Sequence, residues 1–268
     1  MEVLLNTVKI IFLIISAASF VPQYGLVLSR RDCEGLSLIY LLINLIVATQ
    51  QLALWLFFIV DHEEVDGFLV HSPLTVGDWL NLGQFAVVLI GHLILFGAYL
   101  FYPPPRPGQK TVAVLIYIAF LFISVFPVLF IASLPPTGTD SYNDRRWPSA
   151  IFFYISSMLV NPMISALALV AYLPQARELR SRSDVGALRV LGLALQGGIF
   201  LAVAIFWPLR FPQLPLGVSF FMWYQIVGWA LVDNLIFVFV QAMLWWLARR
   251  FKQEVTDVTG ETAPLIAA

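Results

Sequence analysis

The strongest constraint on this chain is a series of long runs that carry almost no charge. A helix needs about 20 apolar residues to cross the roughly 30 Å hydrocarbon core of a bilayer. Seven stretches reach that length: 3–28, 36–60, 79–102, 112–134, 151–173, 188–207 and 220–247. An alternating strand pattern is absent, and an open sheet would leave its backbone groups unpaired in lipid. We therefore expect an all-α membrane protein with seven transmembrane helices.

The composition excludes several classes of protein. Of the 268 residues, 60% are hydrophobic and only 12% are charged, whereas an ordinary soluble domain has about 25% charged residues. A soluble enzyme is therefore excluded, and a net charge of −1 leaves no basic surface for nucleic acid. The single cysteine, Cys33, excludes an internal disulfide and a cysteine-based metal site. His62 and His71 lie in or beside an acidic loop without the spacing of a closed metal site.

The sequence contains no glycine-rich phosphate loop and no nucleophile with a matching base. We therefore expect no catalytic residue, no cofactor and no resident metal.

The distribution of Lys and Arg predicts the orientation. An odd number of helices places the termini on opposite sides, and cytosolic loops carry an excess of basic residues. The side of the C-terminus collects Arg30, Arg31, Arg106, Lys110, Arg177, Arg180, Arg182, Arg189, Arg249, Arg250 and Lys252, whereas the other side has Arg145, Arg146 and Arg210. We expect a lumenal N-terminus and a cytosolic C-terminus.

The chain repeats itself at a constant offset of 152 residues. This offset places Pro22-Gln23 on Pro174-Gln175, Asn44 on Gln196, Lys9 on Asn161, and Asn81 on Asp233. The offset predicts one three-helix unit at 1–102, a linker helix with flanking loops at 103–148, a second three-helix unit at 149–250, and a cytosolic tail at 251–268. The extra crossing starts the second unit in the same direction as the first, so the repeats are expected to be parallel, as in SWEET-type transporters.

The two Pro-Gln pairs predict hinges. A proline inside a helix frees the carbonyl four residues back, so Pro22 frees that of Ala18 and Pro174 frees that of Val170. Gln23 and Gln175 follow directly and can supply an amide donor. We expect these motifs to gate a path at the cytosolic ends of their helices; packing kinks are the alternative.

The pattern of the first motif resembles a known family. The residues are Ser19, Phe20, Pro22, Gln23, Arg30, Arg31, Gly35, Leu36, Ser37 and Asn44. They are similar to the PQ-loop repeat family of membrane transporters, and within it to cystinosin-like carriers; the KDEL receptors are more distantly similar. The resemblance implies seven helices, cytosolic PQ loops, a lysosomal or vacuolar membrane, and export of an amino acid or similar solute, often coupled to protons.

The second unit departs from that pattern at two places. Gln196 stands where the cystinosin-like carriers have a buried acid, which removes one candidate proton carrier. Ala187 and Arg189 stand where the first loop has its Gly35-Ser37 pair.

Asp233 is the strongest candidate for a functional residue. It lies near the middle of the 220–247 stretch, where a charged side chain costs about 2.5–3.5 kcal/mol. It must therefore face a cavity or a partner, or be protonated. We expect it to couple transport to protons or to bind a substrate amine; a structural acid paired with Asn234 or another helix is the alternative.

The other intramembrane polar residues follow the repeat. Asn44, Asn81 and Gln196 can bind a polar solute or join helices, and their repeat relationship favours a shared central cavity with Asp233. Lys9 lies about 20 Å from Pro22 along its helix, so we expect it to extend to the lumenal interface.

Asn161 is followed by Pro162, and this pair can break the fifth helix and form part of a lumenal gate.

The tail carries a sorting pattern. Glu261, Leu265 and Ile266 fit the acidic dileucine motif that cytosolic sorting adaptors read. This predicts delivery to the lysosome or vacuole; a plain polar tail is the alternative.

Together these features predict a secondary transporter that moves a small polar solute, an amino acid, out of the lysosome or vacuole by alternating access. Proton symport rests on Asp233, and uncoupled transport is favoured by the neutral Gln196. The expected partners are the solute, protons, membrane lipid and a sorting adaptor. The alternatives are a lipid scramblase or trafficking protein, which needs a polar groove open to lipid, and a cargo receptor, which needs a basic lumenal pocket.

Overall fold

The structure is a computed structural model that describes residues 2–62, 69–102, 109–135, 145–182, 188, 190–210 and 219–262, with the backbone alone for 182 and 252–262. No strand occurs in these ranges. The elements are α1 (Glu2–Arg30), α2 (Leu38–Val60), α3 (Val76–Phe101), α4 (Gln109–Ser133), α5 (Arg146–Ile155), η1 (Ser156–Val160), α6 (Asn161–Val170), α7 (Tyr172–Arg182), α8 (Val190–Phe206), η2 (Pro208–Arg210), α9 (Phe220–Trp223), η3 (Tyr224–Gly228) and α10 (Trp229–Thr262).

Six helical segments of the described chain are long and apolar enough to cross a membrane. They are Glu2–Arg30, Leu38–Val60, Val76–Phe101, Gln109–Ser133, Arg146–Ser181 and Phe220–Phe251. The remaining apolar helix, α8, has 17 residues, which is about 25 Å at 1.5 Å per residue. The all-helical membrane fold is thus confirmed. Six of the seven expected stretches coincide with these segments, and the seventh, 188–207, coincides with α8, which falls just below the usual span length.

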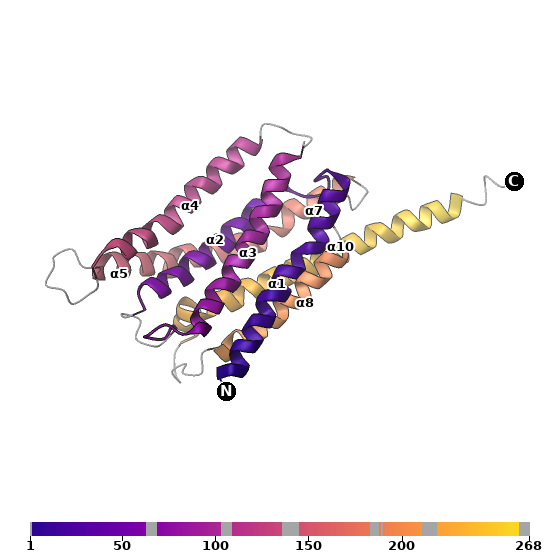
Figure 1. The fold of residues 1–268 in the computed structure, drawn as a ribbon. Coiled ribbons are helices and arrows are strands. Elements are labelled where there is room, and N and C mark those ends of the chain that lie inside the picture. The colour runs from indigo at the N-terminus through magenta and orange to yellow at the C-terminus, as the bar shows by residue number, and fades with distance from the viewer. Residues whose placement is uncertain are drawn as a thin grey trace.

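The helices divide into two groups with the same pattern of neighbours. In the first half, α1 and α2 both pack against α3; in the second, α6 and α8 both pack against α10. The halves meet where α1 contacts α8 and where α2 contacts α6 and α7. The helix α4 packs on α2 and touches α5, and in Figure 1 it lies at the edge of the bundle.

We name the two ends of the bundle by their residues. The Pro-Gln end carries Pro22, Pro174 and the loop 31–37, and the Lys9 end carries Lys9 and the start of α3. The helix α10 continues past the expected end of its span and projects from the bundle in Figure 1, so the tail begins as a helix. Leu265 and Ile266 lie outside the described residues, and only the backbone of Glu261 is described.

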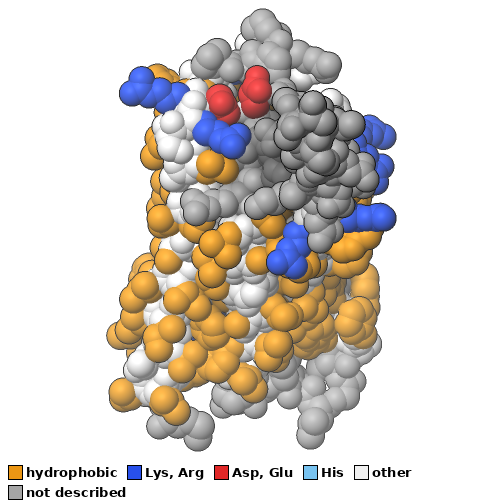
Figure 2. All heavy atoms as spheres, turned by 90° about the vertical axis from the view of Figure 1, so that its right-hand side faces the viewer, with side chains coloured by type: hydrophobic (Ala, Val, Ile, Leu, Met, Phe, Trp, Pro, Cys, Tyr) orange, Lys and Arg blue, Asp and Glu red, His pale blue; other side chains and the backbone are white. Residues whose placement is uncertain are grey.

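The helix α1 shows why this arrangement suits a membrane. Its buried side chains include Lys9, Ser16, Ser19 and Gln23, whereas apolar residues such as Ile14, which is 57% exposed, face outward. Such an inside-out pattern is stable only where the surroundings are lipid and polar groups must find partners within the protein. The surface in Figure 2 agrees, with a broad hydrophobic band and Lys and Arg side chains toward one end.

The fifth span is the most irregular. A π-helical turn, η1, precedes Asn161, whose backbone N–H donates to Ser156 O. The helix therefore widens into a π-helical turn before Asn161-Pro162 and continues as α6. The helix is not broken at this pair as expected. A second interruption, at Ala171, separates α6 from α7 just before Pro174. By contrast, α1 continues without interruption through Pro22.

Two glycines of α3 give a test of the packing between α1 and α3. A Cβ at Gly91 would lie 2.7 Å from the ring of the buried Phe20, whereas a Cβ at Gly97 meets nothing within 4 Å. We expect Gly91→Ala to lower the free energy of unfolding by about 1–3 kcal/mol, because the ring cannot move aside freely. Gly97→Ala is the control and should be neutral or slightly stabilising. Thermal unfolding of the purified variants in detergent measures both, and equal melting temperatures would contradict the close packing.

Candidate functional site

Asp233 lies buried between the two halves of the bundle. It is 4% exposed and accepts hydrogen bonds from Ser165 Oγ on α6 and from Gln51 Nε2 on α2, the latter at 3.2 Å. The Ser165 hydroxyl also lies 2.9 Å from the hydroxyl of Tyr224. The carboxyl group therefore joins α10 to its own half through Ser165 and to the other half through Gln51.

A small cavity of about 20 Å³ lies beside Asp233. Its lining residues are Asn44, Val47, Ala48, Gln51, Val88, His92, Phe200, Asp233, Asn234 and Phe237. One water position needs about 10–15 Å³ of such space, so the cavity has room for about one water and is too small for an amino acid. A solute can reach Asp233 only after the helices separate.

The structure brings together only part of the polar set that the repeat relates. Asn44 and Asp233 line the cavity. Asn81 does not, because it lies seven residues, about 10 Å along α3, before the lining residue Val88. Gln196 is buried on α8 but does not line the cavity. The expectation that all four share one cavity is corrected. The physical reason is that Asn81 and Asp233 lie at different depths in their spans. The offset of 152 maps the start of α3 at Val76 onto residue 228, whereas the last span begins at Phe220. Asp233 therefore lies eight residues deeper in its span than Asn81 does.

The sequence alone does not single out the two hydrogen-bond partners of Asp233, Gln51 and Ser165. Gln51 had a visible signal, since the Gln50-Gln51 pair interrupts an otherwise apolar span. Ser165 had none, because a lone serine in an apolar helix usually bonds its own backbone. His92 lines the cavity between the rings of Phe20 and Phe237, with ring centroids 5.1 and 6.1 Å away.

At the Pro-Gln end, Gln175 closes the space between the halves. It is fully buried; its Nε2 donates to Gly35 O at 2.7 Å, and its Oε1 accepts from the Ser37 N–H at 2.9 Å. Gly35 has a φ of 88°, which glycine adopts readily. The glutamine of the second motif thus binds the loop of the first half instead of the freed Val170 carbonyl. Gln23 of the first motif is also buried.

Between the cavity and the Lys9 end, four aromatic side chains fill the core. Phe85 lies 5.9 Å from Trp55, 5.4 Å from Trp207 and 5.7 Å from Trp229, measured between ring centroids. We call Trp55, Phe85, Trp207 and Trp229 the aromatic plug. Trp207 and Trp229 belong to the second half and the other two to the first, so the plug also joins the halves. The cavity of Asp233 is therefore covered toward both ends.

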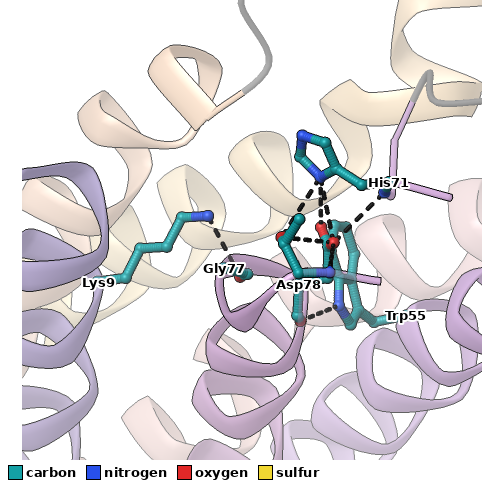
Figure 3. A network of polar contacts seen from close by, with 6 residues as sticks. Lys9, Trp55, His71, Gly77 and Asp78 are labelled. Carbon is teal, nitrogen blue, oxygen red and sulfur yellow. Dashed lines mark hydrogen bonds and ion pairs between the residues drawn. The ribbon is translucent and has the colours of Figure 1, made fainter. Parts of the chain in front are cut away.

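Lys9 does not extend to the interface as expected. It is 5% exposed, and its Nζ donates to Gly77 O at 3.2 Å (Figure 3). The reason is the absence of a side chain at Gly77, where a Cβ would lie 2.8 Å from the ammonium group. Its repeat counterpart Asn161 is buried on α6, and the Asn161 amide nitrogen has no hydrogen-bond partner among the described residues.

The first turn of α3 holds a polar network around Asp78. The Asp78 carboxylate accepts from the Thr75 N–H at 2.8 Å and lies 3.1 Å from His71 Nδ1, while its backbone oxygen accepts from Trp55 Nε1 (Figure 3). Together with Lys9, these bonds anchor α1 and α2 to the start of α3.

Asn81 accepts a hydrogen bond from Arg210 Nη1 at 2.9 Å, and Gln84 accepts from Arg210 Nη2 at 2.7 Å. Arg210 belongs to the second half and is 5% exposed. It had been counted only as one of the few basic residues on its side of the membrane.

A larger pocket of about 470 Å³ lies between α4 and the α5–η1 segment. Ten of its thirteen lining residues are apolar, and the polar ones are Gln50, Ser124 and Ser156. Among the described residues, no group of three or more His, Cys, Asp or Glu could hold a metal ion.

Comparison with known proteins identifies one region. No curated protein and no solved structure matches the chain significantly. The family model described as the PQ loop repeat matches residues 4–59, which comprise nearly all of α1, the loop that Gln175 binds, and α2. Proteins with this repeat are generally transporters rather than enzymes. Residues 4–59 of this integral membrane protein are thus a PQ loop repeat, the module of a family of membrane transporters and related proteins.

Proposed function

We propose that the chain is a secondary transporter that moves a small polar solute, an amino acid, out of the lysosome or vacuole by alternating access. The observation that carries this proposal is the position of Asp233. A buried carboxyl group, shared by two halves and beside a cavity covered toward both ends, has the features of a central solute site in a carrier.

The arrangement of the halves supports this mechanism. In both, the first and second helices pack against the third, as two parallel three-helix repeats would. We propose units at 1–102 and 149–250, joined by the linker at 103–148 and followed by the tail at 251–268. Alternating access then consists of one unit rocking against the other around Asp233.

The charge distribution supports an orientation with the Pro-Gln end in the cytosol. Exposed basic residues at that end include Arg30, Arg31, Arg177, Arg249 and Arg250. In this orientation the Lys9 end faces the lumen, and the adaptor motif of the tail, including Leu265 and Ile266, is cytosolic.

Proton coupling would depend on Asp233. It is the only carboxyl group among the residues that line the cavity, and Gln196 is neutral. A proton or a substrate amine would therefore bind at Asp233, with Ser165 and Gln51 holding the carboxyl group in place.

A lipid-handling function is the second candidate, and the pocket between α4 and α5 is the observation that bears on it. A scramblase needs a polar groove for headgroups, but ten of the thirteen residues that line this pocket are apolar. The pocket suits hydrocarbon better than a headgroup, which places this function behind solute transport.

Transport in liposomes tests the proposal. Purified protein is assayed with amino acids, sugars and labelled lipids, with and without an acidic exterior, because a symported proton enters together with the solute. We expect uptake of an amino acid that the pH gradient stimulates. Asp233→Asn should abolish that stimulation, because an amide cannot carry the proton. Glu178→Gln, which removes an acid on α7 outside the cavity, is the control. Stimulation that persists in Asp233→Asn would contradict the role of Asp233, and lipid flipping without solute uptake would select the lipid function.

The contact of Gln175 can be tested through the single cysteine. Cys33 is buried in the loop that Gln175 holds, and burial together with Asp32 raises the pKa of its thiol to about 11. Gln175→Ala should free the loop, expose the thiol and lower its pKa toward the ordinary value of about 8.5. We expect the rate of maleimide labelling at neutral pH to rise at least about tenfold, since the thiolate is the reactive form.

The labelling rate should also begin to rise at lower pH in Gln175→Ala than in the wild type. Arg177→Ala, an exposed change two residues away, is the control. Equal labelling rates and pH profiles in the wild type and Gln175→Ala would show that Gln175 does not hold the Pro-Gln end closed.

A further inference from the structure

Two positively charged side chains are buried at the Lys9 end without a carboxylate partner among the described residues. The Arg210 guanidinium donates to the side-chain oxygens of Asn81 and Gln84 and lies over the ring of Trp207, with 5.0 Å to its centroid. The Lys9 ammonium donates to the Gly77 carbonyl. All of these acceptors are neutral.

Within the part of the chain that the structure describes, no carboxylate forms an ion pair with Lys9 or Arg210. Burial lowers the pKa of Arg210 to about 10, so the group stays protonated at neutral pH. The Lys9 charge lies near enough to repel it. Two acids, Asp78 and Glu2, attract Lys9, and Asp78, which has the larger effect, is engaged by Thr75 and His71 (Figure 3). A buried cation without a counter-charge costs several kcal/mol, so the cluster favours an anion from outside.

One N–H donor of Arg210 also has no acceptor among the described residues. Its Nε is buried and has no hydrogen-bond partner within the described ranges, although a guanidinium presents five N–H donors. Arg145, at the same end, also has a buried Nε without a partner among the described residues, but the surroundings of its charge differ. It donates to Val60 O and Leu134 O at the carboxyl ends of α2 and α4, where the helix dipole is negative. Arg145 is thus compensated by helix ends, whereas Arg210 contacts two neutral amide oxygens and the Trp207 ring among the described residues.

The position of the cluster connects it with the central cavity. Gln84 lies four residues, about 6 Å, before Val88 of the cavity lining on the same helix. The aromatic plug, which includes Phe85, lies between the two. A molecule that enters from the Lys9 end would therefore meet the basic cluster before the plug opens toward Asp233.

We propose that Lys9 and Arg210 form a binding site for the carboxylate group of a small molecule that enters from the Lys9 end. The guanidinium suits this group because its fork of donors matches a carboxylate. The identification of that molecule with the transported amino acid rests on the proposed function. The amino acid would bind here by its carboxylate before its amine reaches Asp233.

Binding in detergent tests this site without transport. Melting temperatures are measured with glycine, L-leucine and L-glutamine, each paired with its carboxamide, which keeps the amine and removes the carboxylate. We expect at least one acid to stabilise the protein, with its carboxamide binding at least about tenfold more weakly. Arg210→Gln and Lys9→Met should remove this preference, Arg210→Lys should retain part of it, and Arg145→Gln should leave it intact.

Each variant is first checked for a single cooperative transition without ligand, and Arg210→Lys keeps the test valid if Arg210→Gln fails to fold. No preference for an acid over its amide in the wild type, or an unchanged preference in both Arg210→Gln and Lys9→Met, would overturn the proposal. Asp233→Asn separates the two proposals: it should stop proton-stimulated transport but preserve the preference for the acid. A wild type that binds acids through Arg210 but transports nothing would support this site and contradict the proposed function.

Discussion

The structure depends on one constraint: in hydrocarbon, every polar group must find its partner inside the protein. The polar contacts between the halves follow from it, and the two halves hold each other at several depths. Gln175 binds the Gly35 loop, Gln241 donates to the Tyr40 hydroxyl, Gln51 donates to Asp233, and Arg210 donates to Asn81 and Gln84. Burial of apolar surface gains little where the surroundings are equally apolar, so these contacts carry much of the specificity of the interface.

Contacts of this kind can be exchanged. An intramembrane hydrogen bond contributes about 0.6 kcal/mol on average, so breaking the two bonds of Gln175 to the loop 31–37 costs little compared with unfolding a helix. The contacts lie on both sides of Asp233. The proposed alternating access requires those at one end to break while those at the other end persist.

The sequence predicted the helical membrane fold, the positions of the spans and the burial of Asp233, because apolar length and an isolated intramembrane acid are strong local signals. It did not predict the partners of Asp233, since Gln51 and Ser165 come from helices whose relative rotation depends on packing. It does not place Asn81 correctly, because an equal offset in sequence does not give equal depth when the last span begins earlier in its unit. Lys9 was expected at the interface, but the space that Gly77 leaves depends on how α1 and α3 pack.

The central claim is that the two halves move as bodies around a closed site. Distances between pairs of spin labels, measured in a Cys33→Ala background, test this motion most directly. One pair, at Arg31 and Arg180, spans the Pro-Gln end. The other pair, at Val76 and Leu209, spans the Lys9 end, and all four side chains are exposed. If the two halves rock around Asp233, the solute identified in liposomes shifts the two distance distributions in opposite directions. Distributions that do not change, or that lengthen together at both ends, would contradict it.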